Sequence, residues 1–319
     1  MKRIAVFMIL CLVFSQIAAA ETEDGGYAGA FLKLAVQARP AGMGGAYIGV
    51  SDDAAGQLFN PAGAPAVQTK TIASSYRVMD LGRKLGFVSF MLPTRGASGL
   101  GLSWLYAGYG EVDTRNSSGQ KLGGTISSSE NDFGLTFGKQ FAPFLGVGTK
   151  LNYYYKRLSD LSATSIGINM GIMISIDSLF QYGSMEGKPI TDIKAGLVFS
   201  HLAANYSWSD KNAGLAATQD DKFPNLLGLG VSCRAIDRKL LVALDLEKNF
   251  KQALVSRFGA EYDLRNRLLL RGGLNEGVVT AGMGYTFVLK HTTLCFNYAF
   301  SAERTDEGSD HIISLDLKF

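Results

Sequence analysis

The chain has 319 residues and a formal net charge of +3, with 47% hydrophobic residues, 18% charged residues and 38 glycines. A charge so close to zero gives no basic stripe of the kind that binds nucleic acid. Three cysteines in a chain of this length exclude a scaffold stapled by disulfides.

Residues 1–20 have the pattern of a secretory signal peptide. Lys2 and Arg3 precede an apolar run over residues 4–14, and alanines at 18–20 form a small-residue cleavage site. The apolar run is too short to cross a bilayer. We therefore expect an exported chain whose mature part begins at Glu21.

Residues 21–66 form the next predicted unit, and their most compact stretch is 39–63, RPAGMGGAYIGVSDDAAGQLFNPAG. It is dense in Gly and Ala, and its Asn-Pro-Ala-Gly end is a turn signal. Such residues favour tight backbone packing over a solvated linker. We interpret this stretch as a plug for the body of the protein that follows it.

Residues 67–319 show the two-residue alternation of membrane β-strands. Isoleucines at 166, 168, 172 and 174 share one face with Met170, for example, whereas Gly167, Asn169 and Gly171 lie on the other. The same count predicts fourteen strands, near residues 67–77, 83–93, 98–107, 131–141, 144–157, 164–175, 192–202, 225–234, 238–248, 254–263, 267–275, 277–288, 290–300 and 311–319. The predicted fold is an all-β, transmembrane antiparallel barrel of about 14 strands, with a soluble β-sandwich as the alternative.

The connections between these strands are short at one end of the predicted barrel and longer at the other. We expect long polar outer loops over 108–130, 202–224 and 301–310, and one exceptional long connection on the periplasmic side, 176–191. The chain ends in an amphipathic strand that closes on Phe319. A terminal aromatic of this kind looks like the recognition signal of the outer-membrane barrel assembly machinery.

Glycine dominates the parity that should face the lumen, with pairs such as Gly146 and Gly148 on one strand and Gly228 and Gly230 on another. Glycine in a strand allows another backbone or a ligand to approach closely, and it also relieves bending of a closing sheet. Both explanations stay open from the sequence.

Inward charges gather on three successive strands. They are Asp245, Glu247, Arg257, Glu261 and Arg271. Opposite charges on adjacent strands should pair, so one interpretation is a structural ladder. The other is that this wall docks the stretch 39–63 or the polar end of a ligand.

Catalytic and metal patterns are poor. Ser200 and His201 are neighbours in a strand and therefore face opposite sides. There is no C-x-x-C or H-x-x-x-H spacing, and no G-x-G continues into a phosphate-binding fingerprint. We predict neither an enzyme nor a metal site nor a cofactor.

Residues 29–63 resemble the N-terminal signature of the PorV/PorQ group of outer-membrane proteins, which is related to the FadL-type long-chain fatty acid transporters. Residues 258–287, FGAEYDLRNRLLLRGGLNEGVVTAGMGYTF, resemble the closing strands of the same group. The resemblance implies an N-terminal hatch folded inside a fourteen-stranded barrel. It assigns the following residues to the hatch motif: Gly42, Gly44, Gly45, Asn60, Pro61, Ala62 and Gly63. We expect Asn60 and Pro61 to anchor it.

Two functions follow from this resemblance. The first is a hatch-plugged outer-membrane channel or carrier for apolar small molecules. The alternative is a PorV-like shuttle of type IX secretion that binds the C-terminal domains of secreted cargo proteins. The expected partners are outer-membrane lipids, the barrel assembly machinery and either the apolar molecule or the cargo, with no nucleic acid.

Overall fold

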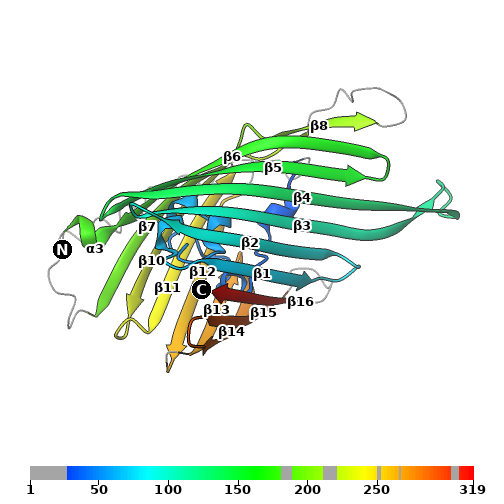
Figure 1. Ribbon diagram of the computed structural model, residues 1–319. Helices are drawn as coiled ribbons and strands as arrows, with labels where there is room; N and C mark the ends of the chain where they lie inside the picture. The colour runs from blue at the N-terminus through cyan, green and yellow to red at the C-terminus, as the bar shows by residue number, and fades with distance from the viewer. Residues whose placement is uncertain (1–26, 181–188, 211–220, 250–252, 266, 303–308) are drawn as a thin grey trace.

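The computed structural model describes residues 27–180, 189–210, 221–249, 253–265, 267–302 and 309–319 (Figure 1). The predicted signal peptide lies outside the described residues. The strands run side by side around one elongated barrel, and the C-terminus lies at the end where the first strand begins.

Fourteen antiparallel strands form a closed ring, because β1 pairs with β16 and each other strand pairs with the next one around the ring. The ring consists of β1 (Thr71–Val78), β2 (Lys84–Thr94), β3 (Ser98–Arg115), β4 (Lys121–Ala142), β5 (Leu145–Leu158), β6 (Leu161–Ser175), β7 (Ile190–Leu202), β10 (Leu226–Ala235), β11 (Leu240–Asn249), β12 (Val255–Leu264), β13 (Leu268–Asn275), β14 (Val278–Val288), β15 (Thr293–Ala302) and β16 (Ser309–Lys318). Each predicted strand overlaps one of these. The predicted antiparallel barrel is confirmed.

Alternation along the strands separates a lumen from an apolar outer face. On β5, Lys150 and Asn152 are buried, whereas the intervening Leu151 and the following Tyr153 are exposed on the outside. The Trp104 ring on β3 stacks with an aromatic ring of β4 on the same outer face. An apolar band with aromatic side chains is the surface that a barrel presents to lipid.

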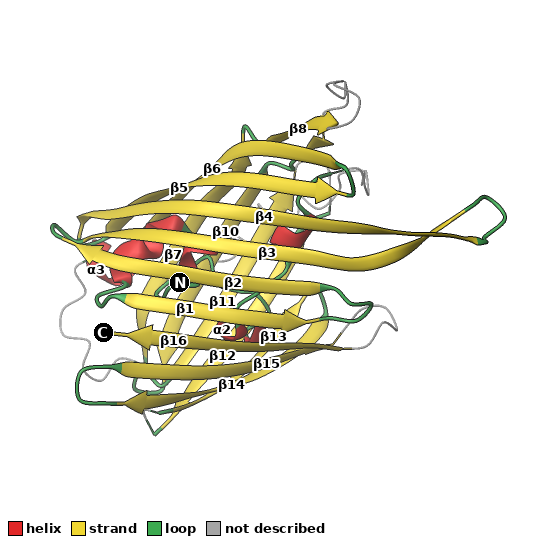
Figure 2. Cartoon of the chain, turned by 45° about the vertical axis from the view of Figure 1, so that its right-hand side comes forward, coloured by secondary structure: helices red, strands yellow, loops and turns green. Residues whose placement is uncertain are grey.

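The two ends of the barrel differ in their connections. At the end where β1 begins and β16 ends, called the short-turn rim, the turns at 95–97, 143–144 and 236–239 are short. At the opposite end, called the hairpin rim, β3 and β4 continue well past their neighbours to a turn at 116–120 (Figures 1 and 2).

The loop predicted over 108–130 is therefore wrong in extent, because most of it is strand. Both faces of this ribbon are exposed beyond the barrel, so its residues carry no alternation of apolar and polar side chains. Register shifts between Gly108 and Glu111 and between Asp113 and Arg115 further interrupt the pattern. Period-two counting finds strands only where one face is buried.

Two short strands add to the hairpin rim outside the ring. β8 (Asn205–Asp210) pairs with the start of β6, and β9 (Asp221–Lys222) pairs with β8. At the short-turn rim, α3 (Ile176–Leu179) opens the long connection between β6 and β7, of which 181–188 lie outside the described residues. Among the residues that the structure describes, no helix is long and apolar enough to cross a membrane.

Residues 27–67, called the N-terminal segment, lie within the ring of strands (Figure 2). They contain four short helical pieces: η1 (Ala30–Lys33), α2 (Ala38–Gly42), η2 (Gly56–Leu58) and η3 (Pro61–Ala66). Pieces this short are not stable alone in water, so their conformation depends on packing against the barrel.

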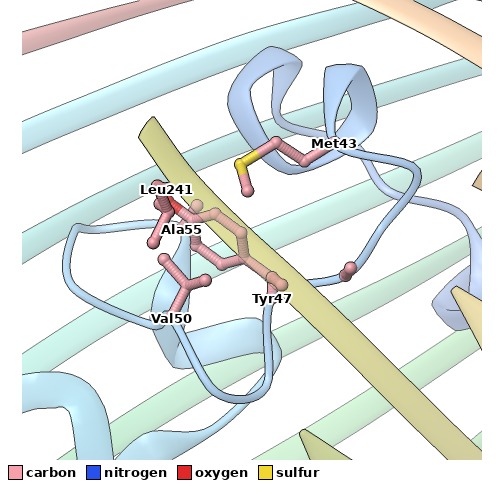
Figure 3. Packing of buried hydrophobic residues seen from close by; sticks show 7 residues of the cluster. Met43, Tyr47, Val50, Ala55 and Leu241 are labelled. Carbon is pink, nitrogen blue, oxygen red and sulfur yellow. The ribbon is translucent and has the colours of Figure 1, made fainter. Parts of the chain in front are cut away.

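One hydrophobic cluster joins the segment to the wall. Met43, Tyr47, Val50 and Ala55 of the segment pack with Leu241 of β11 (Figure 3). The side chains of Met43 and Tyr47 are completely buried. Burying an aromatic and a methionine side chain contributes on the order of 1.5–3 kcal/mol each, so this cluster holds the segment firmly.

Candidate functional site: the lumen and the N-terminal segment

The N-terminal segment rests directly on glycines of the inner wall. A Cβ built on Gly230 would lie 2.5 Å from the backbone nitrogen of Gly49, and one on Gly99 would lie 2.5 Å from the Ala64 carbonyl oxygen. No side chain fits in such a space. At these positions the glycines allow close approach of a second backbone, which is one of the two explanations open from the sequence.

Other inward glycines make room for side chains of the wall itself. A Cβ on Gly134 would collide with the side chains of Lys150 and Ser103, and one on Gly284 would lie 2.9 Å from the Arg271 guanidinium. On β4 and β14, therefore, these glycines leave room for a long side chain of a neighbouring strand and not for the N-terminal segment.

The glycines at 42, 44 and 45 lie against β12, β13 and β14. Gly44 has φ +64°, and a Cβ on it would lie 2.6 Å from the Leu274 carbonyl oxygen, so both its conformation and its space favour glycine. Its N–H donates to the Thr280 hydroxyl at 3.0 Å. Gly42 approaches Gly282 of β14, and Gly45 approaches the side chain of Arg257.

Asn60 connects three parts of the lumen. Its Nδ2 donates to the carbonyl oxygen of Ile48 at 3.2 Å and to that of Ile172 on β6 at 3.1 Å. Its Oδ1 accepts the N–H of Ala62 at 3.1 Å and so caps η3. The side chain is fully buried.

Pro61, Ala62 and Gly63 continue from Asn60 along the inner wall. The carbonyl oxygen of Pro61 lies over Gly138, that of Ala62 lies over Gly146, and Gly63 is pressed against Ser51. The wall glycines at 138 and 146 therefore leave room for the backbone of this turn, and Gly63 leaves room for Ser51 of the segment.

A buried charge network joins the segment to β12 and β13. Arg39 forms a two-pronged pair with Glu261, with both nitrogen–oxygen distances 2.9 Å, and Glu261 also accepts from Arg271 at 2.7 Å. Arg39 reaches Asp52 at 2.6 Å and Asp53 at 2.9 Å as well. The network thus fixes two distant parts of the segment to one wall.

The Arg39 charge also sets the protonation of its neighbour in the segment. Burial alone would raise the pKa of the Asp52 carboxyl, but the charge and hydrogen bond of Arg39 outweigh burial and lower this pKa. The carboxylate form of Asp52 is therefore stabilised by the folded segment.

The five charged residues of the predicted ladder make two kinds of contact, with neighbouring strands and with the N-terminal segment. Arg257 pairs with Glu247 at 3.2 Å, which is a contact between neighbouring strands. Asp245 instead accepts the backbone N–H groups of Tyr47 at 2.6 Å and Ile48 at 2.7 Å. One wall thus carries strand-to-strand pairs and contacts to the segment together.

Several lumen residues were missed by the sequence analysis. Lys150 on β5 pairs with Asp132 on β4 at 2.8 Å, both almost fully buried, and Arg77 on β1 pairs with Asp310 on β16. The signal was available, because each pair lies on inward parity of adjacent strands. Arg39 was missed as well, although it begins the stretch interpreted as a plug.

A cavity of about 80 Å³ lies between the segment and the wall. Leu32, Val36 and Ile48 line it from the segment, whereas Lys150 and Asn152 line it from β5. Apolar and polar side chains both line it, and the polar groups of β5 lie opposite the apolar residues of the segment.

Phe319 follows β16 at the short-turn rim. Its backbone N–H donates to the Lys70 carbonyl oxygen at 2.9 Å, and its side chain is half exposed. Its predicted role as an assembly signal stays a prediction. Among the described residues, no group of three or more His, Cys, Asp or Glu side chains is placed to hold a metal ion.

No protein-family model matches the sequence, and comparison with curated proteins gave no match. Solved structures do match. The toluene transporter TbuX of Ralstonia pickettii aligns with a TM-score of 0.61 and 14% identity, covering 89% of this chain and 98% of that one. This chain therefore has the same fold as that transporter.

Two further structures give the same result. The toluene transporter TodX of P. putida aligns with a TM-score of 0.60 and 13% identity, and a FadL homologue of Pseudomonas aeruginosa aligns with 0.55 and 11%. Each covers 89% of this chain and 98% of its own. The similarity therefore extends over most of this chain and nearly all of each matched structure.

Proposed function

We propose that the protein is an outer-membrane channel for apolar small molecules, in which the N-terminal segment is a hatch. The observation that carries the proposal is the lumen itself, a closed barrel whose inner wall seats a packed segment and leaves a partly apolar cavity. The fold shared with toluene transporters supports the same conclusion.

The kind of molecule follows from what lines the lumen. A general porin needs a wide water-filled passage with polar walls. Here the segment fills the barrel with side chains such as Phe31, Val36, Met43 and Tyr47, all buried. A solute that moves past them gains from apolar contacts, so hydrocarbons and similar molecules fit better than sugars or ions.

The outer membrane is the location that this proposal requires. The exposed apolar band around the barrel, with residues such as Leu102, Ile166 and Phe133, fits contact with lipid tails. The signal-peptide pattern and the terminal Phe319 support export and assembly by the barrel machinery.

The test is uptake in a Gram-negative host that expresses the protein. We expect cells with the protein to take up radiolabelled toluene or hexadecane faster than cells with an empty vector, with no change for a hydrophilic sugar. Equal uptake of the apolar compounds in both strains, at matched protein levels in the outer membrane, would refute the channel.

Membership of the PorV/PorQ group and a role in type IX secretion stay predictions that rest on the N-terminal motif. Co-purification of a secreted protein through its C-terminal domain would support that role, and it would then be tested by deleting this domain from the cargo.

A further inference from the structure

The cavity between the segment and β5 has a polar side with unused hydrogen-bonding capacity. The Asn152 side chain is fully buried, and neither its Nδ2 nor its Oδ1 has a hydrogen-bond partner among the described residues. The Oδ1 of Asp132 is likewise buried with no partner in the described chain. Buried polar groups are normally paired, so these atoms indicate a ligand with polar atoms of its own.

The full charges at this side of the cavity are already neutralised. The Nζ of Lys150 lies 2.8 Å from Asp132, and Arg257 lies 3.2 Å from Glu247. All four residues border the cavity. An incoming carboxylate would have to compete with an existing carboxylate for each of these two cations, and it would lie close to two negative charges.

A neutral hydroxyl group meets neither obstacle. The Asn152 amide offers one donor nitrogen and one acceptor oxygen, and a hydroxyl both accepts and donates. The rest of such a molecule would contact Leu32, Val36 and Ile48 on the other side of the cavity.

The size of the cavity limits what it holds without rearrangement. Since a cavity needs roughly 10–15 Å³ of this kind of volume to hold one water molecule, about 80 Å³ accommodates a hydroxyl group with a few carbon atoms. A longer molecule would have to displace part of the segment.

We propose that this cavity is a binding site for the hydroxyl end of neutral amphiphiles, such as alcohols and phenols, and that it discriminates against carboxylates. Asn152 binds the hydroxyl group, and the Lys150–Asp132 and Arg257–Glu247 pairs exclude the anion. The inference rests on the proposed function, because it names the substrate class that the channel selects.

Saturation-transfer NMR on the full chain in detergent micelles tests the proposal with three probes of equal chain length. These are butan-1-ol, butanoate and 1-chlorobutane, each corrected for its signal with empty micelles. We expect butan-1-ol to bind saturably and butanoate to bind at least about tenfold more weakly, which corresponds to about 1.4 kcal/mol.

Asn152→Leu removes the amide and keeps a side chain of similar size. We expect it to weaken butan-1-ol binding about fivefold, as for the loss of one hydrogen bond, and to leave 1-chlorobutane unchanged. Asn131→Leu is the matched control, because Asn131 bonds to Trp104 on the outer face of the barrel.

Asp132→Asn and Glu247→Gln each release one cation from its carboxylate. We expect both variants to gain butanoate binding, so that the selectivity shifts toward the anion. Retarded migration of the unheated protein in SDS gels checks that each variant is a folded barrel, and two independent variants keep the test valid if one fails to fold.

Butanoate binding as tight as butan-1-ol in the unmodified protein would overturn the proposal. An Asn152→Leu variant with unchanged butan-1-ol affinity would also overturn it. If 1-chlorobutane still binds in that case, the proposed channel function is not affected. Failure of all three probes to bind would count against both the site and the proposed channel.

Discussion

Single side chains decide how the N-terminal segment is attached, and Asn60 is the clearest case. It is buried and donates to carbonyl groups of both the segment and β6. Asn60→Leu removes the bonds to both carbonyls and leaves the buried Ala62 N–H without its side-chain acceptor. Each buried unsatisfied group costs about 1–3 kcal/mol, so we expect the segment to be cleaved by protease much faster than in the unmodified protein.

Asn60→Ser separates capping from anchoring. Serine still caps η3 through its hydroxyl group, but it is too short to reach the Ile172 carbonyl. We expect a cleavage rate close to that of Asn60→Leu if the bond to β6 holds the segment. A rate equal to that of the unmodified protein would assign Asn60 to capping alone.

The glycine wall makes a second prediction about single positions. Gly230→Ala places a Cβ 2.5 Å from the Gly49 nitrogen, and backbone atoms cannot move aside as a flexible side chain can. Gly86→Ala is the matched control, because a Cβ there has nothing within 4 Å. We expect only Gly230→Ala to loosen the segment, measured by hydrogen exchange of residues 45–50. Equal hydrogen exchange in both variants would contradict close packing of the segment against the glycines of the inner wall.

The segment as a unit depends on Arg39, which holds Asp52, Asp53 and Glu261 at once. The pKa of Asp52 is lowered in the folded protein. Its contribution to stability is therefore complete above its unfolded pKa of about 4 and is lost as the pH falls through the lower, folded pKa.

We accordingly expect the segment to become susceptible to pepsin as the pH is lowered from 5 to 2. Arg39→Met should make the segment susceptible already at pH 5 and flatten this pH dependence. Arg271→Leu leaves Arg39 bound to Glu261, so its effect at pH 5 should be smaller. A steep pH dependence that persists in Arg39→Met would show that other groups titrate.

The sequence predicts a strand only where the alternation of its side chains reflects one buried and one exposed face. The alternation identifies strands such as β6 and β11 because each has one face outward and one toward the lumen. The ends of β3 and β4 escape the same count, because both faces of that ribbon are exposed. The inward charges at 245, 257 and 261 follow from parity, whereas which of them contact the segment depends on its path across the wall.

The barrel as a whole was the most predictable feature, since fourteen amphipathic segments close only in a few ways. The path of the segment inside it was not, because small residues such as those of Gly44-Gly45 permit many conformations. Only the three-dimensional wall selects one. The cavity beside Asn152 was equally hidden, since it exists only where the segment and the wall leave a gap.

Whether the barrel conducts through movement of the segment is a question about the assembled protein. The side chains of Ile48 and Val198 both lie against Gly228 on the inner wall. Ile48→Cys with Val198→Cys, in a background with Cys233→Ser and Cys295→Ser, places one thiol on the segment and one on β7. A short reducible bis-methanethiosulfonate reagent should then tether the segment to the wall.

We expect the tether to reduce toluene uptake by cells at least about tenfold, because it keeps the segment packed in the lumen and prevents its displacement. Reduction of the tether should restore uptake, which makes the same cells their own control. Each single-cysteine variant treated with the reagent controls for modification without a link. Full uptake with the segment tethered, as judged by a mass shift of the purified protein, would show that molecules pass without its displacement and would limit the hatch to a structural role.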